Sequence, residues 1–163
     1  MTVDVGLFNE CRLEGDYVLS SGRKHNVLYD FSLLSPTEVA QYVEQLVAQI
    51  PSEFFKEIDF VACPALGGII PGFLVSFAKN KPLLVVDKQG KVRGPQFKSG
   101  KYLIVDDVVT RFTNVNLVRS ALSEISPEFE VAGIAAYIFR GSRTDLDKQG
   151  CPLFYLARKE QVD

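Results

Sequence analysis

The chain has 163 residues, of which 47% are hydrophobic and 23% charged, and its formal net charge at pH 7 is −2. This is enough apolar content for the core of one domain, and we expect residues 1–163 to form a single one. The nearly balanced charge argues against nucleic-acid binding, and no apolar stretch reaches the roughly 20 residues that span a membrane.

The amino terminus and the cysteines favour a cytoplasmic protein. Residues 1–6 lack the basic start and apolar centre of a signal peptide. Cys11, Cys63 and Cys151 have no metal-ligand spacing, and an odd number of cysteines without a secretion signal fits a reducing compartment.

The first third of the chain predicts a small hood and a capped helix. Residues 1–14 are expected to form a short helix or an irregular arm, and residues 16–31 a hairpin, so that the hood lies mainly within 15–34. Ser35, Pro36 and Glu38 form a capping box with proline at the first helical position, which predicts a helix start. The apolar face of that helix is formed by Val39, Val43, Leu46, Val47 and Ile50.

Strands and helices alternate in the rest of the chain, residues 35–163. We predict strands over 60–63, 82–86, 101–105, 130–138 and 153–157, the last at an edge, and helices over 69–79 and 114–125. Residues 87–100 are polar and glycine-rich and are expected to form a mobile loop. The alternation predicts an α/β fold with a mostly parallel sheet flanked by helices.

Two adjacent carboxylates end the apolar run 102–105. Asp106 and Asp107 follow a predicted buried strand, at the position where open α/β sheets bind ligands. Because side chains alternate along a strand, the two cannot both point into the core. The pair suits a polyhydroxylated ligand, a metal or a developing positive charge; alternatively, it is only a polar strand end that opens a turn.

Small polar residues lead from this pair into the next predicted helix. Thr113 or Asn114 would cap the helix, and Thr110 lies in the loop before it. A loop followed by a helix amino terminus offers N–H groups and the helix dipole to an anion. Carboxylates beside such N–H groups describe a pocket for ribose 5-phosphate.

Three ordered stretches of this chain resemble a known family. Residues 103–110 are similar to the signature of the type I phosphoribosyltransferases, in which an apolar strand, two acidic residues and two aliphatic residues precede a phosphate loop. Residues 15–24 and 60–69 resemble the hood turn and the diphosphate loop of the orotate phosphoribosyltransferases. Arg111 and Phe112 depart from the pattern, because the family usually has a small residue and a glycine there. Glycine takes positive φ without cost and phenylalanine does not, so we expect a rebuilt or impaired loop.

The resemblance implies a reaction and a magnesium cofactor. Family members transfer ribose 5-phosphate from phosphoribosyl diphosphate (PRPP) to a nitrogenous base and release diphosphate, and here a pyrimidine base is expected. By the resemblance, Asp106 and Asp107 would hold the ribose hydroxyls and Mg²⁺, in part through water. The residues implied in binding the phosphates of PRPP are Ala65, Leu66, Gly67, Gly68, Thr110, Arg111, Thr113 and Asn114. For Gly67 and Gly68, a plain strand-to-helix turn is the alternative.

The resemblance also assigns the basic residues. Lys88, Lys91 and Arg93 would close over the diphosphate, often across a dimer interface, so a homodimer is expected; the alternative is an ordinary solvated loop. The residues implied in binding the base are Arg140, Arg23, Lys24 and Tyr29. Arg140 could instead be a solvated loop residue.

Two other functional classes share some of these features. The first is a non-catalytic homologue that binds a nucleotide or phosphate ligand as a regulator. The altered phosphate loop favours it, and so does the acidic Asp87, which stands where orotate enzymes usually have arginine. A phosphoacceptor receiver-like domain is not expected, because its acidic pair would follow the first core strand and here the pair follows the third.

Overall fold

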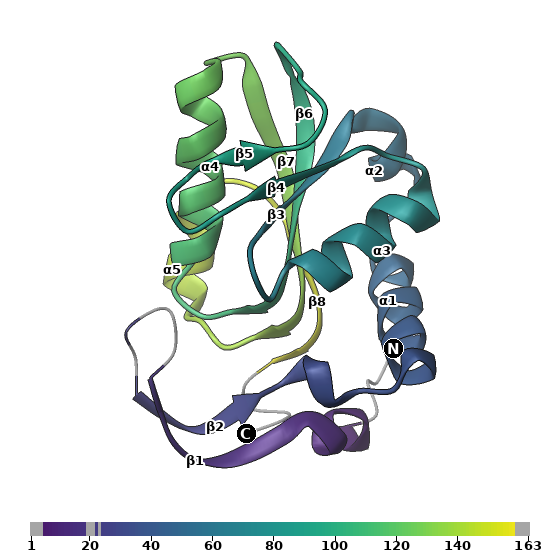
Figure 1. Cartoon of the computed structure of the whole chain (residues 1–163), viewed down its shortest axis with the longest axis vertical. Coiled ribbons are helices and arrows are strands. Elements are labelled where there is room, and N and C mark those ends of the chain that lie inside the picture. The colour runs from purple at the N-terminus through teal and green to yellow at the C-terminus, as the bar shows by residue number, and fades with distance from the viewer. Residues whose placement is uncertain (1–4, 19–21, 23, 159–163) are drawn as a thin grey trace.

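The computed structural model describes residues 5–18, 22 and 24–158, and Figure 1 shows their arrangement. A six-stranded sheet forms the centre, in the order β5-β4-β3-β6-β7-β8. Its strands are β3 (Phe60–Pro64), β4 (Leu83–Val86), β5 (Val92–Arg93), β6 (Gly100–Val109), β7 (Phe129–Phe139) and β8 (Leu153–Arg158). All neighbours pair in parallel except β4 and β5, which are antiparallel, so the prediction of a mostly parallel sheet is confirmed.

Helices cover both faces of this sheet (Figure 1). The helices α1 (Pro36–Ala48), α2 (Ser52–Glu57) and α3 (Ile69–Lys79) lie on one side, and α4 (Thr113–Ile125) and α5 (Arg143–Asp147) on the other. Alternation along the strands divides the core accordingly: Leu103 and Val105 pack towards α1 and α3, whereas Tyr102 and Ile104 pack towards α4. No helix in the described part of the chain is long and apolar enough to cross a membrane.

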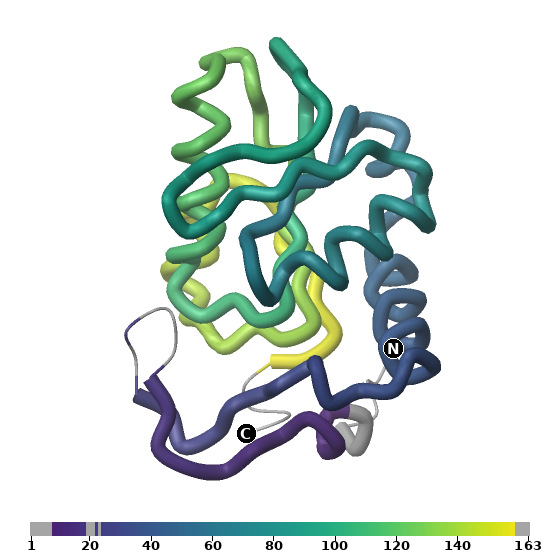
Figure 2. The backbone as a smooth tube through the Cα atoms, viewed as in Figure 1, coloured from purple at the N-terminus to yellow at the C-terminus, as the bar shows by residue number. Residues whose placement is uncertain are grey.

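A separate two-stranded sheet forms the hood. A 3₁₀ helix, η1 (Val5–Cys11), precedes β1 (Arg12–Val18), which pairs antiparallel with β2 (Lys24–Tyr29), and a 3₁₀ turn, η2 (Phe31–Leu33), leads to α1. The tube in Figure 2 shows this segment crossing below the turns that follow β6 and β7. The hood therefore covers the carboxyl ends of the central strands, where α/β sheets bind ligands.

Local signals located several elements well. The capping box is present, with Glu38 N donating to Ser35 Oγ (3.2 Å) and Ser35 N donating to Glu38 Oε2 (2.7 Å). The helix α3 spans the predicted residues 69–79, and β8 lies at the predicted edge.

Other predictions need correction. The strand β6 does not end before the carboxylates but continues to Val109, and β5 lies within the segment 87–100 that was predicted as a loop. The N-cap of α4 is Phe112, not Thr113 or Asn114. The helices α2 and α5 were not predicted, because six and five residues are too short for a helical period to be recognised.

Candidate active site

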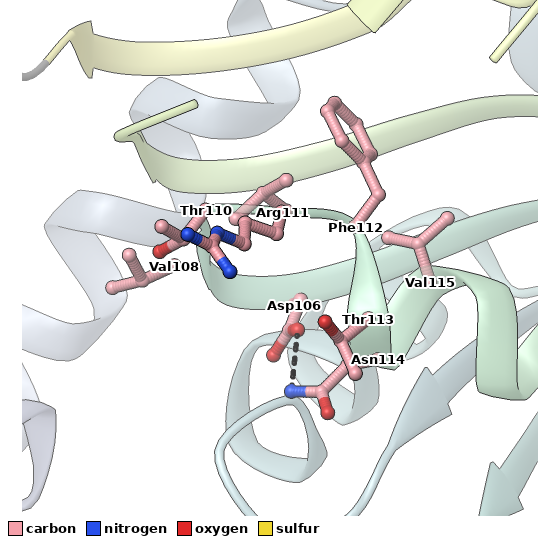
Figure 3. Close-up of a pocket in the computed structure, with 9 residues that line it drawn as sticks. Asp106, Val108, Thr110, Arg111, Phe112, Thr113, Asn114 and Val115 are labelled. Atoms are coloured by element: carbon pink, nitrogen blue, oxygen red, sulfur yellow. Dashed lines mark hydrogen bonds between the residues drawn. The ribbon is translucent and has the colours of Figure 1, made fainter. Parts of the chain in front are cut away.

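The two carboxylates lie inside β6 and face different surroundings. Asp106 is buried, with only 2% of its surface exposed, and lines a hollow at the start of α4. Its Oδ1 accepts a hydrogen bond from Asp107 N (2.9 Å), and its Oδ2 accepts one from Asn114 Nδ2 (3.4 Å), which Figure 3 shows as a dashed line. Asp107 is half-buried, its Oδ1 accepts from Val108 N (2.7 Å), and it lines two cavities under the hood.

Burial raises the pKa of both carboxyl groups. For Asp106 the main cause is the loss of water, and the neighbouring charge of Asp107 raises the pKa of Asp106 further. For Asp107 burial again raises the pKa, while hydrogen bonds from neighbouring groups act in the opposite direction. Two carboxylates held this closely favour a bound cation, because a positive charge relieves their repulsion.

The predicted phosphate loop lies directly beside Asp106. Thr110, Arg111, Thr113 and Asn114 line a small hollow of about 20 Å³ together with Asp106. The first helical hydrogen bond of α4 runs from Asn116 N to Phe112 O (2.8 Å), so the preceding N–H groups have no acceptor inside the helix. Such N–H groups at a helix start favour an anion.

Phe112 takes the left-handed backbone conformation, which glycine adopts at the lowest cost. Its φ is 61° and its ψ is 17°, and its ring is 2% exposed. The left-handed conformation costs roughly 1–2 kcal/mol for a residue with a Cβ. Burial of a phenylalanine ring contributes roughly 1.5–3 kcal/mol, which offsets that cost. Figure 3 shows the ring pointing away from Asp106 and Asn114. Arg111 is exposed.

The predicted diphosphate loop meets Asp107. A Cβ built on Gly67 would lie 2.8 Å from Asp107 Cγ, so only glycine allows the backbone to approach this carboxylate so closely. A Cβ on Gly68 would lie 2.8 Å from Val105 O, which explains the tight packing of the loop on β6. The peptide bond between Ala65 and Leu66 is cis, and the side chain of Leu66 is 78% exposed.

Two cavities open between the hood and these loops. One, of about 290 Å³, includes Tyr29, Leu66, Gly67, Asp107 and Tyr137 in its lining. The other, of about 200 Å³, is lined in part by Tyr29, Asp107, Thr110, Asn114 and Arg140. Asp107 therefore stands where the diphosphate loop, the phosphate loop and the hood meet, and the combined volume suits a small ligand.

Arg140 connects β7 to the hood. Its side chain is 3% exposed, so it is not a solvated loop residue. Its Nη1 donates to Val27 O (3.0 Å), its Nη2 donates to His25 Nδ1 (2.9 Å), and its guanidinium lies 5.6 Å from the centre of the Tyr29 ring. No local sequence signal indicated the contact between His25 and Arg140, which are more than 100 positions apart.

The described basic residues that were predicted for the loop after β4 and for the hood turn do not line these two cavities. Lys88, Lys91, Arg93 and Lys24 are exposed, and Arg23 lies outside the described residues. Asp87 orders its own loop: its Oδ1 accepts from Gln89 N (3.0 Å) and Lys91 N (2.9 Å), and its Oδ2 lies 3.8 Å from Arg93 Nη2. Among the described residues, no three His, Cys, Asp or Glu side chains are grouped as a metal site would require.

Solved structures define the class of the fold. The crystal structure of orotate phosphoribosyltransferase from Aeropyrum pernix superimposes with a TM-score of 0.81, covering 96% of this chain and 94% of its own, at 23% identity. A Mycobacterium tuberculosis orotate phosphoribosyltransferase in complex with PRPP gives a TM-score of 0.69 at 17% identity, covering 96% of this chain and 94% of its own. The fold is that of the type I phosphoribosyltransferases.

Sequence comparison identifies the family. No protein-family model matches the chain. The orotate phosphoribosyltransferase of Sphingopyxis alaskensis is 30% identical over 155 residues, which cover 88% of this chain and 76% of that protein. That of Pyrococcus horikoshii is 29% identical over 161 residues, covering 92% of this chain and 86% of that protein. The chain belongs to the orotate phosphoribosyltransferase family, a family of glycosyltransferase enzymes.

Proposed function

We propose that this protein transfers ribose 5-phosphate from PRPP to a ring nitrogen of a pyrimidine base, with orotate as the first candidate, and releases diphosphate. The observation that supports this best is the position of Asp107, which contacts the glycine loop and lines both cavities under the hood. Family membership supplies the reaction class.

The proposed reaction breaks the bond between the ribose C1 and a diphosphate oxygen and forms a bond between C1 and the base nitrogen. Positive charge develops at C1 in the transition state, and a carboxylate already fixed in a partly dry site stabilises it. Asp107 would be this carboxylate: its negative charge would face C1, and its oxygens would bind the ribose hydroxyls. Gly67 and Gly68 would present backbone to the diphosphate, while Thr110, Thr113 and Asn114 would hold the 5′-phosphate at the start of α4.

Magnesium fits the side chains present. Mg²⁺ is usually bound through one or two carboxylates together with substrate phosphates, rather than by a cage of protein ligands. Asp107, with support from Asp106, would hold it in part through water, and the close approach of Gly67 leaves this carboxylate beside the diphosphate loop. When bound, the ion would neutralise charge on the leaving diphosphate.

The base would enter the cavity of about 200 Å³ that Tyr29 and Arg140 line. The contacts of Arg140 with β2 fix its guanidinium at the cavity wall, so its charge would face a carbonyl or carboxylate of the base. Lys88, Lys91 and Arg93 remain candidates to cover the diphosphate from the exposed loop before β6.

The test is diphosphate release from magnesium PRPP in the presence of individual bases. We expect turnover with a pyrimidine base, and Asp107→Asn should lower kcat by roughly 100-fold or more, as for the loss of one preorganised electrostatic contact. Asp59→Asn is the matched control, because Asp59 is an exposed carboxylate at the amino end of β3.

Failure of the unchanged protein to bind PRPP would refute the proposal. Binding of PRPP or a nucleoside monophosphate without turnover for any base would favour the alternative of a non-catalytic, ligand-binding homologue. Turnover that survives Asp107→Asn unchanged would refute the role of that carboxylate.

We further propose that two copies of the chain associate through α3. Ile70, Phe73 and Phe77 are 52%, 55% and 77% exposed and recur at helical spacing, and Leu66 extends this apolar face by one turn. A continuous exposed apolar face of this kind marks an interface, and a two-fold dimer would bury it against itself. Leu66 and Ile70 also line the cavity of about 290 Å³, so the partner would stand beside the site.

Sedimentation equilibrium tests the dimer. The unchanged chain should sediment as a dimer, and Phe73→Glu combined with Phe77→Glu should give a monomer. Ile125→Glu is the control, because Ile125 is 55% exposed on α4 on the opposite side of the sheet. A monomeric unchanged chain would contradict the proposal.

A further inference from the structure

We infer that Phe112 is a positioning residue for the 5′-phosphate: its buried ring holds the loop after β6 in the left-handed shape that exposes the N–H groups of α4. The inference rests on the proposed function, because it assigns a role within that phosphate site. It concerns a position at which the family pattern has glycine and this chain does not.

The backbone conformation of Phe112 joins β6 to α4. With φ at 61°, the chain turns at the third residue after β6, and the Phe112 carbonyl accepts the first helical hydrogen bond, from Asn116 N (2.8 Å). No side chain caps this helix start. The N–H groups that precede Asn116 therefore remain available to an anion, and their direction depends on the backbone at Phe112.

The ring fixes this conformation from the far side of the loop. It is 2% exposed, belongs to the core between the sheet and α4, and contacts Phe139 with ring centres 5.9 Å apart. Figure 3 shows the ring on the side of the backbone opposite Asp106, so it occupies no space in which the phosphate would lie. A residue without this ring would leave the turn free to relax towards negative φ.

The same contact ties the phosphate loop to the base side of the site. Phe139 is the last residue of β7 and directly precedes Arg140. A Cβ on Gly141 would lie 2.6 Å from Phe139 Cε2 and would overlap the carbonyl oxygen of Thr110, so the turn after β7 packs directly on the loop after β6. Phe112 thus positions the phosphate loop relative to the strand end that carries Arg140.

The experiment compares Phe112→Gly with Phe112→Ala. Both variants lose the ring, but only glycine adopts positive φ without cost. We expect both to unfold at a lower temperature than the unchanged protein. In calorimetric titration with magnesium PRPP, well below either unfolding temperature, Phe112→Gly should bind within about threefold of the unchanged protein, and Phe112→Ala at least tenfold more weakly. If Phe112→Ala does not fold, Phe112→Ser takes its place, because serine also lacks the ring and keeps a Cβ.

Asn80 supplies the control for strain alone. It is the other non-glycine residue at positive φ in the described part of the chain (φ 51°), at the end of α3. Asn80→Ala should lower the unfolding temperature without changing the dissociation constant of PRPP.

Each outcome separates the two proposals. One outcome is that the unchanged protein binds PRPP while Phe112→Gly and the variant that keeps a Cβ have equal dissociation constants for it. That result would overturn only the role of Phe112. Absence of PRPP binding by the unchanged protein would overturn the proposed function, and this inference with it.

Discussion

Replacing Asp106 with asparagine should stabilise the fold at neutral pH while it impairs the site. The carboxylate is 2% exposed and lies beside Asp107, so burial and like charge both raise its pKa. Asparagine has nearly the same shape, keeps an oxygen that can accept from Asp107 N, and loses the charge. Rotation of the Asn114 amide would place its oxygen opposite the new amide group.

The sign of the pH dependence follows from the direction of the shift. Because the folded pKa is above the unfolded value of 3.8, the folded state keeps a proton that the unfolded chain releases. Stability is therefore lost as the pH rises from about 4 through the raised folded pKa, and the loss is complete above it. Asp106→Asn removes this loss, so its stabilising effect should grow over that pH range.

The expected gain at pH 7 is roughly 1–3 kcal/mol, the usual size of a buried charge effect. For a chain of this length each kcal/mol corresponds to about 2–4 °C in Tm. Thermal unfolding of both proteins should be followed by circular dichroism from pH 3.5 to pH 8, with Asp59→Asn as the exposed control. Enzymatic activity should fall in the more stable variant, because a buried charge that destabilises the fold is often needed for function.

Two results would refute this reasoning. A variant that is less stable than the unchanged protein at pH 7 would mean that the hydrogen bonds of the carboxylate outweigh its burial. A gain of equal size at pH 3.5 and pH 7 would mean that the effect does not come from ionisation.

Two further substitutions separate function from stability. Gly67→Ala places a Cβ 2.8 Å from Asp107 Cγ. We therefore expect kcat/KM for PRPP to fall at least tenfold (about 1.4 kcal/mol) with little change in Tm. Unchanged kinetics would contradict the close approach of the glycine loop to this carboxylate. Ser35→Ala removes the capping-box hydrogen bond from Glu38 N. The free energy of unfolding, measured in urea, should fall by about 1 kcal/mol while kcat stays unchanged. An unaltered urea midpoint would show that the cap does not stabilise the protein.

Elements that depend on neighbours along the chain were predictable without the structure. The helix that begins after Ser35 is specified by a side chain and a backbone N–H three residues apart. The alternation of buried strands and helices was sufficient to predict a mostly parallel sheet. The acidic pair and the glycine loop were also visible as short motifs, although their chemical roles remain predictions.

The way in which distant residues meet at the site follows from the three-dimensional packing of the chain. Phe112 was expected to disturb the phosphate loop, and its sequence neighbours give no sign that Phe139 receives its ring. Arg140 was assigned to the base, yet its guanidinium also binds Val27 and His25 in the hood, more than 100 positions away. Such contacts depend on how the hood and the sheet pack in three dimensions, and local propensity and periodicity contain no information about that packing.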